Sequence, residues 1–514
     1  MTPDSDIIAS RAIEPKWFSA PYPEWSGEVP SPYQHAAVEY RISRKHCLIG
    51  DAPGLGKSCE ALLFGNSIGA EYTLIVCPAS LRLNWAREVK LWSCIEGATT
   101  YPVLKSKDGI SLEHNYVIIS YDLLRHTGIM TALMDERWDH VILDEAHAMK
   151  DPKGNSRTKG ICGWVKSGEY IPGLADVSDR FTLLSGTILP NQPLECYNAV
   201  RLMNHEAIDY MSLEAFTENY YEEGKGWVRG PVLKDKDPSG APCEPYYVSE
   251  LYYSNAVRNR PYNLDDLQHR LRKNVMVRRL KEDVLTQLPP KEWHPVPLES
   301  SVAVRKALRH PGWKKVNKLH EFDEEAFNKG IPVDGEISTA MRLLGEAKAP
   351  LVADYIEELL ESGVHKIVVA AWHRNTQPEE GVGSTGLSVL HYLRERLAKY
   401  GLTYMDGSTT PLNKQAAVDK FQRDEATRII LGQLSTIGEG WTLTKAQDAV
   451  FAEFYWVPGK NDQFLDRIHR RGQEGDYVMG HMPFIPGSMD ERVLGTAIWK
   501  DKNIYQALDA QEAA

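Results

Sequence analysis

Short apolar runs, each followed by small or charged residues, recur along this chain. Residues 47–49 run into a glycine-containing loop, and residues 59–64 after that loop have a composition that favours a helix. Residues 141–143 form a β-branched run that ends on two carboxylates, and residues 367–370 form a further apolar run. Continuous apolar runs of this kind are typical of parallel strands with both faces covered by helices. The pattern therefore predicts an α/β fold with buried strands in both halves of the chain.

The length of the chain predicts more than one folded unit. Its 514 residues exceed what a single hydrophobic core usually contains. We expect two α/β lobes, each a parallel sheet flanked by helices, with helical insertions between them. The expected divisions are an N-terminal arm (1–29), a first lobe (30–205), an insertion and inter-lobe bridge (206–339), a second lobe (340–505) and a tail (506–514).

The loop at residues 51–58, Asp-Ala-Pro-Gly-Leu-Gly-Lys-Ser, has the composition of a phosphate cradle. Gly54 and Gly56 allow backbone N–H groups to turn inward around phosphates, and Lys57 adds a positive charge near them. The hydroxyl of Ser58 is placed to bind Mg²⁺. Asp51 stands where the generic phosphate loop has glycine, and a glycine-rich helix start is the simpler interpretation of these residues taken alone.

Two carboxylates, Asp144 and Glu145, follow the apolar run at 141–143. Parallel sheets present their ligand-contacting residues at the carboxyl ends of the strands. Asp144 is suited to holding Mg²⁺, and Glu145 to orienting or deprotonating an attacking water. An acidic surface turn is the alternative interpretation, and the phosphate-loop pattern upstream makes it the weaker one.

Arginines near the end of the chain supply the third candidate group. Arg467 and Arg470 lie three residues apart, so on a helix they would share a face. Such a pair is suited to reaching from one lobe to a phosphoryl group held by the other. A solvated basic helix face is the alternative, but Gln463 and Gly472-Gln473 flank the arginines in a pattern that such a face does not require.

These three groups, in this order, resemble the Swi/Snf-type ATPases of helicase superfamily 2. In that resemblance residues 51–58 are the P-loop and residues 144–147, Asp-Glu-Ala-His, are the DEAH box. The segments 342–350 and 370–373 most resemble the corresponding sequences of the annealing-helicase (HepA-related) branch. Other matching stretches are 33–34, 78–85, 184–187, 191–195, 277–285, 288–291 and 405–409. The match spans roughly residues 30–505.

The resemblance implies two RecA-like lobes with ATP and Mg²⁺ bound between them. It implies that Gln34 reads the adenine and that Glu145, Arg467 and Arg470 are catalytic. The residues implied to hold the nucleotide and its metal are Gly54, Leu55, Gly56, Lys57, Ser58 and Asp144, with Ser58 and Asp144 on the metal. The residues implied to contact nucleic acid are Ser80, Gly407, Ser408, Arg278 and Arg279. Trp441 and Thr442 depart from the family, which has Leu and Asn there.

Charge limits where DNA can bind. The formal net charge of −11 means that the surface as a whole repels nucleic acid, so a local basic strip is required. Residues 270–281 form one candidate, since they contain basic residues and no acid; a brace helix with its arginines in water is the alternative. Paired tyrosines at 220–221, 246–247 and 252–253 are suited either to stacking on bases or to packing an insertion onto its own lobe.

The interpretation that fits best is a translocase on double-stranded or forked DNA that hydrolyses ATP. A strand-separating or RNA-directed helicase and an ATP-gated clamp are the alternatives. Seven scattered cysteines without a C-x-x-C pair indicate neither a disulfide framework nor a zinc site. With no signal-peptide or membrane-span pattern, we expect a soluble intracellular monomer, in a bacterium or a virus-infected cell rather than a nucleus, with a protein partner for targeting.

Overall fold

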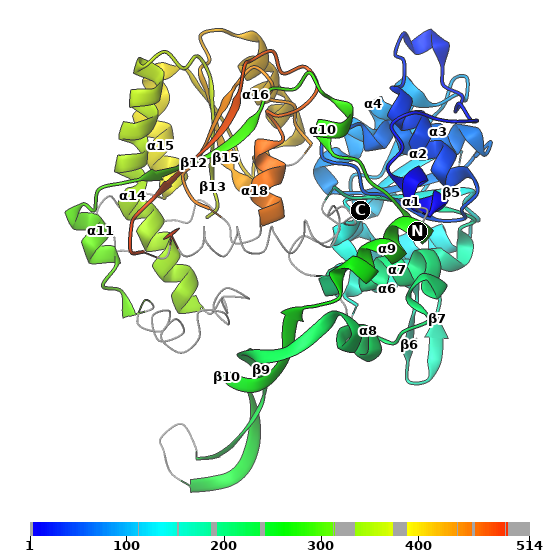
Figure 1. Cartoon of the computed structure of the whole chain (residues 1–514), viewed down its shortest axis with the longest axis horizontal. Coiled ribbons are helices and arrows are strands. Elements are labelled where there is room, and N and C mark those ends of the chain that lie inside the picture. The colour runs from blue at the N-terminus through cyan, green and yellow to red at the C-terminus, as the bar shows by residue number, and fades with distance from the viewer. Residues whose placement is uncertain are drawn as a thin grey trace.

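The computed structural model describes residues 4–491, except residues 112, 152–153, 187–192, 237–241, 312, 314–334, 374–387, 439, 455–457 and 489. The described residues form two lobes, each built on a parallel sheet, and a long hairpin extends away from the first lobe (Figure 1). Both predicted α/β lobes are therefore confirmed. The matching positions Thr187, Asn191 and Gln192, the predicted end of the second lobe after residue 491 and the predicted tail lie outside the described residues.

The first lobe contains a seven-stranded sheet in the order β11-β1-β8-β5-β2-β4-β3, with every neighbouring pair parallel. Its strands are β1 (Cys47–Ile49), β2 (Thr73–Cys77), β3 (Thr100–Pro102), β4 (Tyr116–Ser120), β5 (His140–Asp144), β8 (Phe181–Leu184) and β11 (Met276–Val277). The helices around it are α1 (Ser5–Ser10), α2 (Pro32–Ile42), α3 (Lys57–Ser67), α4 (Arg82–Trp92), α5 (Thr127–Met134), α6 (Ser156–Cys162), α7 (Tyr197–Asn204), α8 (Leu213–Tyr220) and α9 (Leu264–Asn274).

The second lobe contains a six-stranded parallel sheet in the order β12-β17-β16-β13-β15-β14. Its strands are β12 (Lys291–Pro297), β13 (Ile367–Ala371), β14 (Leu402–Met405), β15 (Ile429–Gln433), β16 (Asp448–Phe451) and β17 (Val478–Phe484). Its helices are α11 (Val302–Ala307), α14 (Gly335–Glu361), α15 (Val389–Leu397), α16 (Pro411–Arg423), α17 (Leu434–Ile437) and α18 (Pro458–Leu465), while α10 (Lys281–Val284) lies between the two lobes.

Successive strand residues enter opposite layers of the core, which explains the continuous apolar runs. In β2, Leu74 and Val76 pack into one cluster while Ile75 and Cys77 pack into another. The same alternation in β13 sends Val368 to a different cluster from its neighbours. Side chains on both faces of a strand are thus removed from water, as expected for sheets covered on two sides.

The predicted boundaries of the lobes were too narrow. β11 pairs with β1 in the first sheet, so the first lobe extends well beyond residue 205. β12 pairs with β17 in the second sheet, so the second lobe starts before residue 340. Each of these strands pairs with a strand that is distant in sequence. The apolar pattern is local, so it does not predict such pairing.

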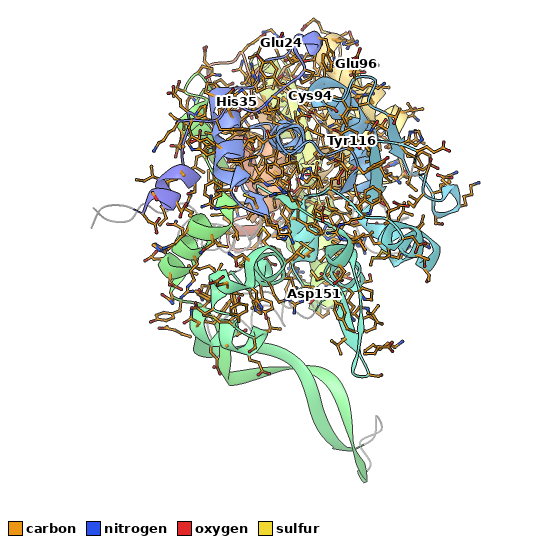
Figure 2. The ribbon with its side chains drawn as sticks, turned by 90° about the vertical axis from the view of Figure 1, so that its right-hand side faces the viewer. Glu24, His35, Cys94, Glu96, Tyr116 and Asp151 are labelled. Atoms are coloured by element: carbon orange, nitrogen blue, oxygen red, sulfur yellow. The ribbon has the colours of Figure 1, made fainter. Side chains whose placement is uncertain are left out.

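The insertion after α8 is a β-hairpin and not a helix, which corrects that part of the prediction. β9 (Tyr221–Lys236) pairs antiparallel with β10 (Pro242–Pro261), and Figures 1 and 2 show the hairpin leaving the body of the protein. At its base Tyr220 donates to Asp266 Oδ2 (2.8 Å) and the backbone N–H of Leu194 donates to the Tyr221 hydroxyl (2.8 Å). Because both tyrosines are buried, this pair packs the insertion onto its own lobe and is not exposed to bases. The side chains of the other two pairs lie outside the described residues.

No helix among the described residues combines the length and the apolar character needed to cross a membrane.

Candidate nucleotide site

Two glycines shape the loop between β1 and α3. Gly54 has φ of +91° and Gly56 has φ of +82°, in the left-handed region that residues with a Cβ rarely adopt. A Cβ on Gly54 would lie 3.0 Å from the Cβ of Arg470, and one on Gly56 would lie 2.5 Å from Nε2 of Gln34. The glycines therefore allow the turn and also the close approach of two other predicted site residues.

Lys57 begins α3 and turns back over the loop. Its Nζ donates to the backbone oxygen of Asp51 (2.8 Å) and more weakly to that of Ala52 (3.4 Å). Burial lowers the pKa of the ammonium, and the carboxylates of Glu145 and Asp51 act in the opposite direction. The lysine of the first predicted group and the carboxylates of the second are thus near enough to interact electrostatically.

Asp144 ends β5 and is held from two directions. Its Oδ2 accepts a hydrogen bond from Nε1 of Trp85 (2.8 Å), and its Oδ1 accepts one from the backbone N–H of Glu145 (2.9 Å). Burial raises the pKa of Asp144, and the neighbouring Glu145 carboxylate adds to that increase. A bound cation would stabilise the ionised form, which is consistent with the predicted role in holding Mg²⁺.

Glu145 has a backbone conformation that is unusual for its residue type. Its φ is +52° and its ψ is +52°, a left-handed geometry that costs of order 1 kcal/mol in a residue other than glycine. Its Oε2 lies 3.2 Å from Nδ1 of His147. Burial disfavours the anion, but His147 and Lys57 outweigh burial and lower the pKa of Glu145. The carboxylate is thus kept ionised beside Lys57.

Arg470 brings the second lobe to the loop. Its Nη1 donates to the backbone oxygen of Trp441 (2.9 Å), and its side chain packs against Gly54. Burial lowers the pKa of Arg470 to about 10, the positive charge of Arg467 adds to the shift, and the guanidinium remains charged at neutral pH. Arg467 donates from Nε to the backbone oxygen of Gln463 (3.0 Å).

The two arginines do not share a helix face as the spacing predicted. α18 ends at Leu465, and residues 466–468 form a turn followed by bends. It is this turn that allows Arg470 to extend toward the first lobe while Arg467 stays against the end of its own helix.

Gln34 is the third residue of α2, and its side chain contacts the phosphate loop. Its Oε1 accepts from the backbone N–H of Ser31 (2.8 Å), and its Nε2 donates to the backbone oxygen of Leu55 (3.2 Å), which also accepts from the Tyr33 hydroxyl (2.9 Å). This is a capping box whose glutamine also supports the phosphate loop. Its predicted contact with adenine stays a prediction.

Arg278 and Arg279 are not part of a DNA-binding strip, and this corrects the sequence-based expectation. The guanidinium of Arg279 is fully buried and forms ion pairs with Asp51 Oδ2 (2.5 Å) and Glu60 Oε1 (3.0 Å). Arg278 donates from Nη1 to the backbone oxygens of Gly50 (2.6 Å) and Gly186 (3.1 Å). These arginines face the phosphate loop and not water, so the brace-helix alternative is wrong for them as well. Asp51, which breaks the generic loop pattern, is the partner of Arg279.

Replacing Arg279 with Met is expected to lower the free energy of unfolding by about 3–5 kcal/mol, because two carboxylates would stay buried without their cation. Urea unfolding followed by circular dichroism measures this. The control is Arg137→Met, which removes an exposed ion pair with Asp179 and should change stability little. If both variants unfolded at the same urea concentration as the parent, the Arg279 ion pairs would not stabilise the fold.

The remaining DNA candidates lie on segments next to inter-lobe contacts. Ser80 is in a short 3₁₀ turn (Ala79–Leu81), and Leu81 packs against Gly440 of the second lobe. Gly407 and Ser408 are exposed and lie just before α16, whose Gln415 accepts a hydrogen bond from Arg87 of α4 (3.3 Å). The structure thus places these residues on facing parts of the two lobes, and their contact with nucleic acid stays a prediction.

Several residues of the site had no assigned role from sequence. They are Trp85 and His147, which contact the two carboxylates, Glu60, which pairs with Arg279, and Trp441, whose carbonyl holds Arg470. Trp85 and His147 lie within motifs that the family resemblance covers, but no spacing rule indicates which atom each contacts.

The chain matches two described families. The SNF2-related domain matches residues 33–331, and the helicase conserved C-terminal domain matches residues 351–472. The chain belongs to the SNF2-related family. The first match covers more than half of the sequence and contains the phosphate loop and both carboxylates. The second contains Arg467 and Arg470. The Swi/Snf-type resemblance inferred from the motifs is thereby confirmed.

Among curated relatives, the chain is 27% identical over 498 residues to the SWI/SNF-related matrix-associated actin-dependent regulator of chromatin subfamily A-like protein 1 of Xenopus tropicalis, covering 94% of this chain and 46% of that protein. It is 27% identical over 481 residues to the human DNA annealing helicase and endonuclease ZRANB3, covering 90% of this chain and 39% of that protein. This SNF2-related chain therefore spans less than half the length of these relatives.

A solved structure titled Sulfolobus solfataricus SWI2/SNF2 ATPase core in complex with dsDNA matches with 15% identity and a TM-score of 0.39. The match covers 94% of this chain and 98% of that one.

Proposed function

We propose that this SNF2-related chain is a motor that hydrolyses ATP between its two lobes and moves along double-stranded or forked DNA. The observation that carries the proposal is the placement of Arg470, from the second lobe, against Gly54 of the phosphate loop. A site completed by both lobes couples the state of the nucleotide to the contact between the lobes. An ATPase confined to one lobe has no need of this arrangement.

The donor groups fit ATP with Mg²⁺. The loop has the positive-φ glycines that let backbone N–H groups face phosphates, and Lys57 is already within the turn of the loop. Ser58 and Asp144 supply the hydroxyl and the carboxylate that would hold Mg²⁺, which prefers few protein oxygens together with phosphates and water. Bound there, the ion would offset charge on the phosphate oxygens.

Each protein group then has one task in hydrolysis. Lys57 binds the phosphates, and Gln34 keeps the loop in shape and is the group proposed to contact adenine. Glu145, held ionised by His147 and Lys57, accepts a hydrogen bond from the attacking water and orients it. Arg470, and Arg467 beside it, offset negative charge on the phosphoryl group as it transfers.

We further propose that the nucleic acid along which the motor moves is duplex or forked DNA, as the names of relatives in the annealing-helicase branch suggest. Support from the chain is the placement of Ser80, Gly407 and Ser408 on facing parts of the two lobes. With a net charge of −11, the surface as a whole repels DNA, so DNA must bind through a limited part of it.

Steady-state ATP hydrolysis is the test, measured without nucleic acid and with duplex, forked, single-stranded DNA or RNA, using Lys57→Ala as the blank. We expect duplex or forked DNA to raise kcat at least about tenfold, with the effect lost at high salt because phosphate contacts are screened. Stimulation by RNA alone would assign the motor to RNA. Hydrolysis that no nucleic acid changes would support the ATP-gated clamp instead.

A further inference from the structure

The segment 278–281, which we call the linker segment, contacts the phosphate loop at one end. Arg278 and Arg279 bind the backbone of Gly50 and the carboxylate of Asp51. The backbone also takes part, since Arg279 donates its N–H to Asp51 Oδ1 (3.0 Å) and its carbonyl accepts from the N–H of Ala52 (3.0 Å). This end of the linker segment is therefore fixed to the loop and moves with the first lobe.

The other end of the linker segment contacts residues 466–470 of the second lobe, which we call the arginine turn. Nζ of Lys281 donates to Asp466 Oδ1 (2.7 Å) and to the backbone oxygen of His469. The side chains of Lys281 and Asp466 are only 8% and 6% exposed, so this ion pair is shielded from water. Cε of Lys281 is also close to Gly54, at 3.8 Å from where a Cβ would stand.

Lys291 also lies near Asp466, but it is fixed in the second lobe, unlike Lys281. Lys291 lies 3.4 Å from Asp462 and 3.5 Å from Asp466, but it begins β12 in the second sheet. It therefore stays with the arginine turn when the lobes move. Lys281 is the lysine that joins Asp466 to a segment fixed on the phosphate loop.

We propose that Lys281 is a positioning residue that holds the arginine turn in register with the phosphate loop, so that Arg470 reaches the phosphoryl group. Arg279 and Lys281 are two residues apart, at most about 7 Å of chain, and both of their ion pairs are buried. A displacement of the loop is thus passed directly to Asp466 and to the turn that carries Arg470. This inference rests on the proposed ATPase site.

The charges around Lys281 make the bridge dependent on pH. The groups that face Lys281 are Asp466, His469 and Arg470 on the turn, Lys291 on β12 and Asp462 on α18. Burial lowers the pKa of Lys281 to about 8, Lys291 and Arg470 act in the same direction, and Asp466 opposes them. The bridge is therefore complete below about pH 8 and is lost as pH rises through that value. His469, whose pKa burial lowers to about 4, stays neutral over this range.

Lys281→Met keeps the length of the side chain and removes its charge. We expect kcat for hydrolysis without DNA to fall at least about tenfold, while the Kd for ATP changes by less than about threefold, because the loop keeps its own contacts. Lys281→Arg should restore most of kcat and move the alkaline fall in activity to higher pH. Asp466→Asn should resemble Lys281→Met, and the double variant should be no worse than the more impaired single variant.

Lys399→Met is the matched control, because it removes an exposed lysine that pairs with Glu357 (2.9 Å) in the second lobe, and it should leave kcat unchanged. Equal losses of kcat and ATP affinity in Lys281→Met, or an alkaline limb that Lys281→Arg does not move, would overturn the positioning role. Since the readout is hydrolysis without DNA, loss of the DNA response in the parent chain would defeat the translocase proposal alone. A parent chain without any ATPase activity would defeat both.

Discussion

Replacing Glu145 with Gln is expected to lower kcat for ATP hydrolysis by about 10²–10⁴-fold while ATP still binds. The amide has the shape of the carboxylate but cannot accept a proton or orient water as an anion does. His147 and Lys57 lower the pKa of Glu145, which favours the ionised form that the proposed mechanism needs. The measurement is single-turnover hydrolysis together with the Kd of a fluorescent ATP analogue.

The matched control for this variant is Glu136→Gln. Glu136 is exposed and belongs to the same lobe, just before β5, so kcat should be unchanged. Normal turnover in Glu145→Gln would remove Glu145 from the mechanism. Loss of ATP binding in the same variant would show instead that its left-handed backbone requires the native contact with His147.

Replacing Arg470 with Ala is expected to lower kcat by about 10³–10⁵-fold, the range found where a single arginine offsets the charge of a transferring phosphoryl group. The side chain packs against Gly54 of the first lobe, and its guanidinium is held by the carbonyl of Trp441 in the second lobe. ATP should bind nearly as well as in the parent, because Lys57 and the loop remain. Comparing kcat with the Kd for ATP separates the two effects.

Arg423→Ala provides the control, since Arg423 is exposed at the end of α16 in the same lobe. An equal loss of kcat and of ATP affinity in Arg470→Ala would assign Arg470 a structural role between the lobes. A normal kcat would mean that Arg470 does not reach the phosphates during hydrolysis.

The fold was predictable because its elements are local. Residues 47–49, 141–143 and 367–370 lie in the strands β1, β5 and β13, since sheets covered on both faces require continuous apolar strands. The hairpin β9–β10 was not predicted as strands, because its Gly, Pro and Lys residues resemble a loop. β11 and β12 were assigned to a bridge because pairing with a distant strand leaves no mark on a two- or seven-residue segment.

The site was predictable only in part, for a related reason. The loop at 51–58 and the paired carboxylates are each contiguous in sequence, so their residue types were enough to propose a chemistry for them. The basic residues at 270–281 show the opposite case. Positive charge in a sequence indicates a DNA surface only if it faces water, and Arg279 is instead buried against Asp51, 228 residues away in the chain.

The sequence by itself determined the two-lobed α/β class and the family to which the chain belongs, and it marked the glycine loop at 51–58 and the carboxylates at 144–145 as the candidate site. These features depend on short-range order of residue types, which the sequence records directly. Only the tertiary structure decided that Arg470 meets Gly54 and that Lys281 joins the loop to Asp466. Burial and ion pairing depend on which distant segments become neighbours, and that is settled by how the strands and lobes pack together.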